Sequence, residues 1–154
     1  MATAHATTTE AMERMQVVLA CQEVVVRAAA CVDAGDADLL ALLFTEDAVL
    51  VRPGADPVTG RAAIRDVYAR RPAERITRHL VTNMLVDVDS PTAAHVRSRV
   101  LLWTGSKADA ESPHGRAAHQ RQMIGEFDDR LLRDERGAWL IQRRDARFVL
   151  YRDT

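Results

Sequence analysis

His79 and Asp33 are the residues of this sequence best suited by type to acid and base chemistry. An imidazole titrates near neutral pH, so His79 could take a proton from carbon or oxygen and later return it. An aspartate beside it could hold the imidazole in one tautomer and stabilise the imidazolium, which gives a catalytic pair without a metal. The alternative is structural: Asp33 caps the turn that follows it, and His79 is a hydrogen-bonded histidine of the core.

Other reactive side chains give weaker signals. His95 alternates with Arg97 and Arg99, so its strand face is expected to be exposed to solvent. His114 and His119 lie five residues apart without carboxylates at a usual ligand spacing, and we expect no metal site. The sequence contains no GxGxxG, phosphate loop, HExxH, CxxC or GxSxG motif. We therefore expect no cofactor and no covalent catalysis by serine or cysteine.

Asp33 must be positioned by the N-terminal third of the chain, whose pattern is helical. Thr7 and Glu10 have the form of a capping box, and the apolar and small residues from 12 to 32 are too dense for strand alternation. Gly35 is well placed to end this helix in a left-handed conformation. Asp33 is therefore expected at the end of a long helix.

Two further helices are predicted before the sheet. Asp36 can cap a short helix that includes residues 39–43. A short strand is expected at 48–51, after which Thr59 can cap a third helix that Pro72 ends.

His79 must be positioned by a strand, because the pattern changes to period two from residue 76 onward. Short turns at 89–91 and 134–137 and a longer polar loop at 105–115 separate the candidate strands, so consecutive strands should pair as antiparallel hairpins. Helices first and strands afterwards favour an α+β fold. The predicted strands are 76–88, 93–104, 118–133 and 138–150.

Bulk properties fit one ordinary domain. The chain has 154 residues, of which 47% are hydrophobic and 28% charged. We expect residues 1–9 to form a disordered tail and residues 10–154 to form a single domain. Cys21 and Cys31 fall about 15 Å apart on one helix, too far for a disulfide, and are expected to be buried thiols in a reducing cytoplasm.

Charge and hydropathy argue against two kinds of partner. The formal net charge is −1, so the arginines between residues 65 and 78 do not create a chain-wide positive field, and we expect no nucleic-acid partner. No run of about 20 uninterrupted apolar residues stands out, and we expect no membrane partner.

Six segments follow one another in a recognisable order and spacing: VDAGD (32–36), LFTEDA (43–48), GRAAI (60–64), RHLVTN (78–83), GEFDDRL (125–131) and WLI (139–141), with Arg144 behind them. Together, over about residues 12–150, they resemble the SnoaL-like branch of the nuclear transport factor 2-like superfamily, whose relatives include scytalone dehydratases and the small subunits of ring hydroxylases. The resemblance implies a cone-shaped roll, in which three helices cover a strongly curved, mixed but mostly antiparallel sheet around an apolar pocket.

The resemblance also implies roles for individual residues. Asp33 and His79 would both point into the cone as the catalytic pair. The expected ligand-binding residues are Tyr68, Val81, Asn83 and Phe127. Tyr68 could supply a hydroxyl that relatives carry where this chain has Phe127; alternatively, it packs with its hydroxyl at the rim.

The strand from His79 to Val88 carries apolar residues on both predicted faces. Strict alternation places Val81 and Leu85 on one face and Leu80, Met84 and Val86 on the other. One face would line the pocket or core and the other would contact a second copy, so a homodimer through the sheet is expected.

Three functions remain open at this point. The first is a cofactor-independent lyase or isomerase that acts by proton transfer on a small apolar, cyclic or polyketide-like molecule. The second is a ligand-binding or accessory protein without catalysis, favoured by Phe127 and by valines 24–26, where relatives tend to have an aromatic residue. The third is a dimerising module like the small subunit of a ring hydroxylase. The family holds all three, so fold alone does not choose among them.

On the later strands, two further expectations concern packing. Asp129 should pair with Arg144 or Arg147 of the neighbouring strand in a structural contact. Trp103, Trp139 and Ile141 are expected in the core.

Overall fold

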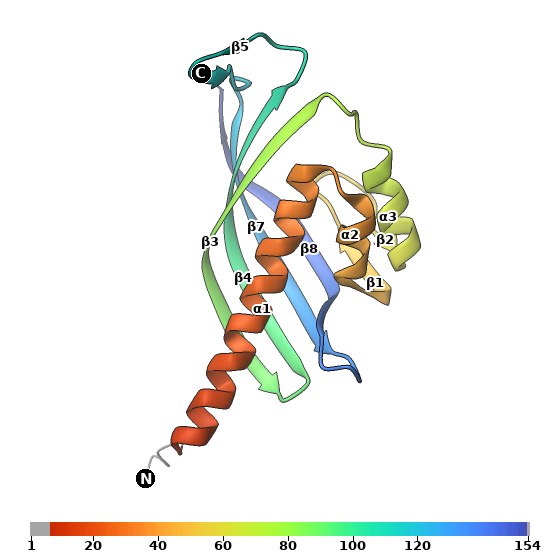
Figure 1. The fold of residues 1–154 in the computed structure, drawn as a ribbon, viewed down its shortest axis with the longest axis vertical. Helices are drawn as coiled ribbons and strands as arrows, with labels where there is room; N and C mark the ends of the chain where they lie inside the picture. Colours follow the sequence, from red (N-terminus) through yellow and green to blue (C-terminus); the bar gives the residue numbers. More distant parts are fainter. Residues whose placement is uncertain (1–6, 154) are drawn as a thin grey trace.

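The computed structural model describes residues 7–153, and Figure 1 shows their arrangement. Three helices precede most of the strands. The helices are α1 (Thr8–Ala34), α2 (Ala37–Leu42) and α3 (Arg61–Ala69), and the strands are β1 (Phe44–Val51), β2 (Val58–Thr59), β3 (Arg75–Ser90), β4 (Ala93–Ser106), β5 (Glu111–Ser112), β6 (Gly115–Arg116), β7 (Gln122–Arg133) and β8 (Trp139–Arg152).

Six of these strands form one curved, open sheet in the order β2-β1-β8-β7-β4-β3. Neighbouring strands are antiparallel except β1 and β8, which are parallel. The helices lie on one face of the sheet, with α1 running along it (Figure 1). The predicted α+β fold, with three helices on a mixed and mostly antiparallel sheet, is confirmed.

Capping interactions fix both ends of α1. The Thr7 hydroxyl accepts a hydrogen bond from the Glu10 backbone N–H, and the Glu10 carboxylate accepts one from the Thr7 N–H at 2.7 Å. The helix therefore begins at Thr8, so the predicted disordered tail was wrong for residues 8 and 9; residues 1–6 lie outside the described part of the chain. At the other end Gly35 has φ 74°, the left-handed conformation that was predicted.

The start of α3 differs from the prediction. Its N-cap is Gly60, with φ 93° and no side-chain capping bond, rather than Thr59. Thr59 is instead paired with Val49 across the β1–β2 ladder, so it is committed to a strand. The cap of the second helix is as predicted, because Asp36 accepts a hydrogen bond from the Leu39 N–H at 2.8 Å.

Strand β3 does not alternate strictly. Its register with β4 shifts between Thr82 and Leu85, and Asn83 there has φ 51°. The extra residue reverses the face, so Val81 and Met84 both pack against the core while Leu85 is exposed. The predicted grouping of Val81 with Leu85, and of Met84 with Leu80, was wrong for this reason.

The core lies between α1 and the concave face of the sheet. Its largest fully buried side chains include Phe44, Leu50, Ile64 and Ile141. Ile141 and Trp139 are core residues as predicted, whereas Trp103 is 38% exposed. Trp103 follows the inward-facing Leu102 on β4, so its side chain points to the opposite, outer face of the sheet, where its partner across the β3–β4 ladder is Arg78.

The two cysteines are buried and unpaired on α1, as predicted, and burial raises the pKa of the Cys21 thiol to about 11. On length and composition alone, α1 also meets the criterion for a membrane-crossing helix, contrary to the sequence expectation. A core helix meets the same criterion, and α1 buries Cys21, Val25 and Ala28 against the rest of the fold.

Candidate functional site

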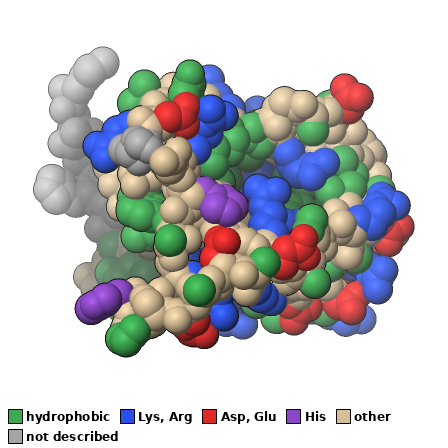
Figure 2. All heavy atoms as spheres, turned by 90° about the horizontal axis from the view of Figure 1, so that it is seen from above, with side chains coloured by type: hydrophobic (Ala, Val, Ile, Leu, Met, Phe, Trp, Pro, Cys, Tyr) green, Lys and Arg blue, Asp and Glu red, His purple; other side chains and the backbone are tan. Residues whose placement is uncertain are grey.

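A cavity of about 300 Å³ opens between the helices and the concave face of the sheet. Figure 2 shows basic and histidine side chains around a hollow whose visible interior is hydrophobic. Its lining comes from α1, β1, α3, β3, β4, β7 and β8, so most of the fold contributes to it. The residues are Ala29, Val32, Leu50, Arg52, Pro53, Tyr68, Arg71, Arg75, Thr77, His79, Val100, Leu102, Gly125, Glu126, Phe127, Arg144, Ala146, Arg147 and Phe148.

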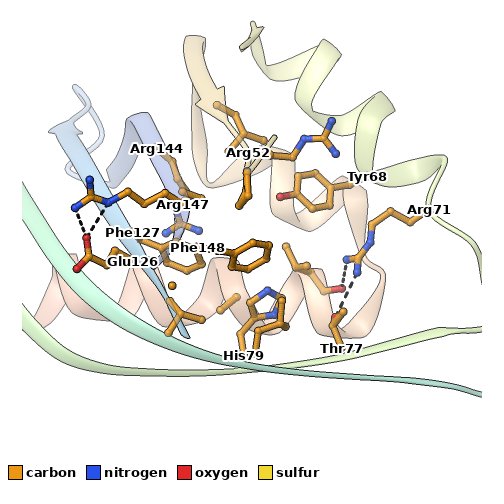
Figure 3. Close-up of a pocket in the computed structure, with 18 of the residues that line it drawn as sticks. Arg52, Tyr68, Arg71, Thr77, His79, Glu126, Phe127, Arg144, Arg147 and Phe148 are labelled. Carbon is orange, nitrogen blue, oxygen red and sulfur yellow. Dashed lines mark hydrogen bonds and ion pairs between the residues drawn. The ribbon is translucent and has the colours of Figure 1, made fainter. Parts of the chain in front are cut away.

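Asp33 and His79 meet at the edge of this cavity. His79 Nδ1 lies 2.5 Å from Asp33 Oδ1, and the two side chains are only 14% and 16% exposed. An ionised carboxylate can only accept, so the proton of a neutral imidazole must be on Nδ1. Nε2 is then unprotonated, and it has no protein partner among the described residues. His79 lines the cavity and points into it, toward Phe148 (Figure 3).

Asp33 is held from several directions. The His79 backbone N–H donates to Oδ2 at 2.8 Å, and the Thr77 hydroxyl donates to Oδ1 at 2.8 Å. Burial alone raises the pKa of the Asp33 carboxyl, but the hydrogen bonds and charge of His79 and the Thr77 hydroxyl outweigh it and hold this pKa below 3.8. Asp33 is therefore a carboxylate at neutral pH.

Asp33 differs from the expectation in one respect. It was expected to point into the cone with His79, but it is not among the residues that line the cavity. It holds the imidazole from outside this cavity, so it would act on a ligand bound there through His79. Its role in any chemistry is that of a positioning residue.

Phe127 and an ion pair form the wall beside His79. The Phe127 and His79 ring centroids are 6.4 Å apart, and the Arg144 guanidinium carbon lies 4.3 Å from the Phe127 centroid. Arg144 donates from Nε and Nη2 to the two carboxylate oxygens of Asp129 at 2.7 and 2.8 Å, and both side chains are buried. Burial lowers the pKa of Arg144, but Asp129 outweighs it, so the guanidinium stays charged. The predicted pairing of Asp129 with Arg144 is confirmed.

The four predicted ligand-binding residues are not all at the cavity. Tyr68 and Phe127 line it, and the Tyr68 hydroxyl is directed toward its interior (Figure 3). Val81 instead packs against the core, one inward-facing position beyond His79. Asn83 is exposed at the bulge of β3, where its backbone conformation rather than a ligand explains its residue type.

Within residues 7–153, no group of three or more His, Cys, Asp and Glu side chains is arranged to hold a metal ion. His119 Nδ1 instead lies 3.2 Å from the Thr104 hydroxyl. His95 forms a second His–Asp pair, with Nε2 2.7 Å from Asp128 Oδ1, but this pair lies on the outer face of the sheet and outside the cavity.

The SnoaL-like domain family matches residues 13–145 of this chain, which is most of its length and includes both Asp33 and His79. The chain belongs to the SnoaL-like family. Among curated proteins, no sequence match was found.

Solved structures share the SnoaL-like fold. A proposed scytalone dehydratase from Novosphingobium aromaticivorans superposes with a TM-score of 0.78 at 23% identity, over 94% of this chain and 91% of its own. A proposed aromatic ring hydroxylase from the same organism gives 0.73 at 26% identity, over 91% and 94%. A hexachlorocyclohexane dehydrochlorinase, LinA type 2, gives 0.77 at 16% identity, over 93% and 92%.

Sequence reasoning missed the arginines of this SnoaL-like cavity. Arg52, Arg71, Arg75 and Arg147 all line it. Arg71 and Arg75 were considered only as part of a possible nucleic-acid surface, Arg147 only as a partner of Asp129, and Arg52 was not considered. No local pattern marks them, because they come from segments that meet only in the folded chain.

Gly125 was recognised as part of a motif but not for its packing. A Cβ there would lie 2.7 Å from the Arg147 carbonyl oxygen, so only glycine allows β8 to approach so closely. This close approach occurs at the cavity wall, beside Phe148.

Proposed function

We propose that this SnoaL-like protein is a cofactor-independent lyase or isomerase that moves a proton on a small cyclic molecule. The observation that carries the proposal is the 2.5 Å contact of Asp33 with His79 Nδ1, which leaves Nε2 free at the wall of a largely apolar cavity. The fold is shared with a proposed dehydratase and a dehydrochlorinase. Both names describe elimination reactions, in which a proton is removed from carbon, and this supports the proposal.

The steps follow from the geometry. His79 Nε2 takes a proton from a carbon next to a carbonyl group, or next to a carbon that carries a leaving group. The electron pair of that C–H bond then forms an enolate, or forms a C=C bond as the bond to the leaving group breaks. Asp33 stabilises the imidazolium that forms. The proton then returns to another carbon, which completes an isomerisation, or to a departing hydroxyl, which completes a dehydration. Tyr68 and Arg144 line the same cavity and would stabilise negative charge on an oxygen.

Proton removal can be tested before the natural substrate is known. Cyclic ketones and hydroxylated aromatic compounds of one or two rings are incubated with the protein in D₂O, and deuterium uptake at carbon is followed by mass spectrometry. We expect at least one compound to exchange at a rate at least about tenfold above the buffer rate. If compounds bind but none exchanges faster than in buffer, the proposal is wrong and the ligand-binding alternative gains support.

We also propose a homodimer through the outer face of the sheet. Strand register places Leu80, Leu101, Ile124 and Leu150 in one row across β3, β4, β7 and β8. Leu80, Ile124 and Leu150 are 53%, 42% and 62% exposed, so the row is an apolar stripe facing away from the cavity. Burying such a stripe against its copy would remove this surface from water.

A further inference from the structure

The cavity is lined by far more positive than negative charge. Glu126 is the single carboxylate among the described residues that line it, and it is paired with Arg147, which donates to it from Nε at 2.9 Å. Arg144 is paired with Asp129. This leaves three lining arginines, Arg52, Arg71 and Arg75, for which no carboxylate partner lies within ion-pair distance among the described residues.

Arg52 has the least satisfied side chain of the three. Its Nε is inaccessible to solvent and has no hydrogen-bond acceptor in the described part of the chain. A charged donor that is removed from water and left without an acceptor is costly, and native proteins rarely leave one so. Nε itself is covered, but the Arg52 side chain is only partly buried and lines the cavity, so an anion bound there would offset this cost through the charge of the guanidinium.

Arg71 lies on the same side of the cavity as Arg52, beyond Tyr68 (Figure 3), and its guanidinium carbon is 5.8 Å from the Tyr68 ring centroid. It donates to the Val32 carbonyl oxygen at 3.0 Å and to the Thr77 hydroxyl at 3.4 Å, both neutral acceptors. Burial lowers the pKa of Arg71 most, and the charges of Arg75 and Arg52 lower it further, against the influence of Tyr68 and Asp33, which raise it. Arg75 and Arg52 are therefore close enough to act unfavourably on the Arg71 charge, and an anion between these side chains would act favourably on it.

The opposite side of the cavity is apolar. Val100, Leu102, Phe127 and Phe148 line it near His79. A cavity of about 300 Å³ lies at the small end of the range for small-molecule sites and suits a ligand of one or two rings.

We infer that the ligand of this cavity is a small cyclic carboxylic acid, whose carboxylate is bound by Arg52, Arg71 and Arg75 and whose ring lies on the apolar wall beside His79. A planar carboxylate matches the two parallel donors of a guanidinium better than a neutral carbonyl does. Anchoring the acid at the arginines would hold its ring carbons next to Nε2 of His79. The inference rests on the proposed function in placing the substrate in this cavity.

The test compares each acid with its own neutral amide. Binding of benzoate and benzamide, and of 2-naphthoate and 2-naphthamide, is measured by isothermal titration calorimetry at low ionic strength and about pH 8. We expect each acid to bind at least about tenfold more tightly than its amide. Equal affinity of acid and amide, or no binding of either acid up to about 10 mM, would overturn the inference.

Variants then locate the anion site. Arg52→Gln and Arg75→Gln should each lower the acid-to-amide ratio by about tenfold, while Arg136→Gln, which makes the same charge change in the distant β7–β8 turn, should not. If both cavity variants melt at the wild-type temperature and still show the wild-type acid-to-amide affinity ratio, the preference for acids does not come from these arginines. If neither variant folds, the wild-type protein provides the test: its acid-to-amide affinity ratio should fall in high salt, and a ratio unaffected by salt would overturn the inference.

Failure of this inference is distinguishable from failure of the proposed function. His79→Gln should retain the acid-to-amide ratio, because the arginines remain. If the ratio holds but no compound exchanges carbon-bound protons, the site binds acids without the chemistry. If exchange occurs while acids and amides bind equally, the chemistry stands and the ligand class is wrong.

Discussion

Asp33 occupies a position that is unfavourable for an aspartate unless something compensates it. It lies in the last turn of α1, where the carbonyl groups of the helix give the end partial negative charge, and this turn contains no basic residue. Three hydrogen bonds, from the His79 ring, the His79 backbone and Thr77, provide the compensation. The carboxylate thus joins the end of α1 to β3, and the same bonds orient the imidazole.

Loss of this carboxylate should have a pH-dependent cost. The folded pKa of Asp33 is below 3.8, so the unfolded chain binds its proton at a higher pH than the folded chain does. The stability it contributes is complete well above pH 3.8 and is lost as the pH falls through the folded pKa. We expect Asp33→Asn to lower the free energy of unfolding by on the order of 1–3 kcal/mol near neutral pH, with a smaller difference in acid.

Urea unfolding of both chains between about pH 6 and pH 3 measures this difference. A cost that stays constant across the range would show that the charge of Asp33 does not stabilise the fold.

At the scale of elements, the bulge in β3 allows one strand to serve two purposes. The first part of β3 presents Thr77 and His79 to the site, and Val81 packs beside them. After the extra residue, Met84 continues the same inward face. Asn83 allows this because asparagine tolerates positive φ better than most residues.

Substitutions at Asn83 should therefore change the free energy of unfolding according to how well the new residue tolerates positive φ. We expect Asn83→Val to lower the free energy of unfolding by about 1–2 kcal/mol, because a β-branched residue is strained at positive φ. Asn83→Gly should cost less, and chemical denaturation of the two variants provides the comparison. Equal stability of the valine and glycine variants would mean that the bulge relaxes at no cost.

Local signals predicted the elements better than they predicted their contacts. The caps at Thr7, Gly35 and Asp36 depend on neighbouring residues, so they could be found in the sequence. The bulge could not, because a single Thr-Asn pair within an apolar strand has no distinct pattern. The parallel pairing of β1 with β8 joins segments about 90 residues apart, and the family resemblance implied only that the sheet would be mixed, not which strands would be parallel.

The same limit applied to the site. Asp33 and His79 are 46 residues apart, and their contact was expected from the resemblance rather than from spacing. The arginine side of the cavity combines the end of β1, the end of α3 and the start of β3, so its charge became visible only in the folded chain.

For the whole molecule, the sheet separates two surfaces. Its concave face carries the cavity and its outer face carries the apolar row formed by Leu80, Leu101, Ile124 and Leu150. A dimer through the outer face would leave each cavity open, so assembly and ligand binding need not compete.

Sedimentation velocity tests the dimer. We expect the wild type to sediment as a dimer at about 100 μM and Leu80→Glu combined with Ile124→Glu to sediment as a monomer, because four charges would be buried at the interface. Leu42→Glu is the control, since Leu42 is 60% exposed on α2, which lies on the opposite face of the sheet from the apolar row (Figure 1). A monomeric wild type, or a double variant that remains dimeric, would rule out this interface.

Two His–Asp pairs within residues 7–153 allow the most direct test of proton transfer at the cavity. His79 with Asp33 lines the cavity, whereas His95 with Asp128 lies on the outer face. The measurement is the rate of deuterium uptake into a compound that the wild type exchanges, compared among wild type, His79→Gln and His95→Gln. We predict that His79→Gln lowers the rate by about 10²–10⁴-fold and that His95→Gln leaves it unchanged. An unchanged rate in His79→Gln, with its fold intact, would contradict the assignment of His79 as the base.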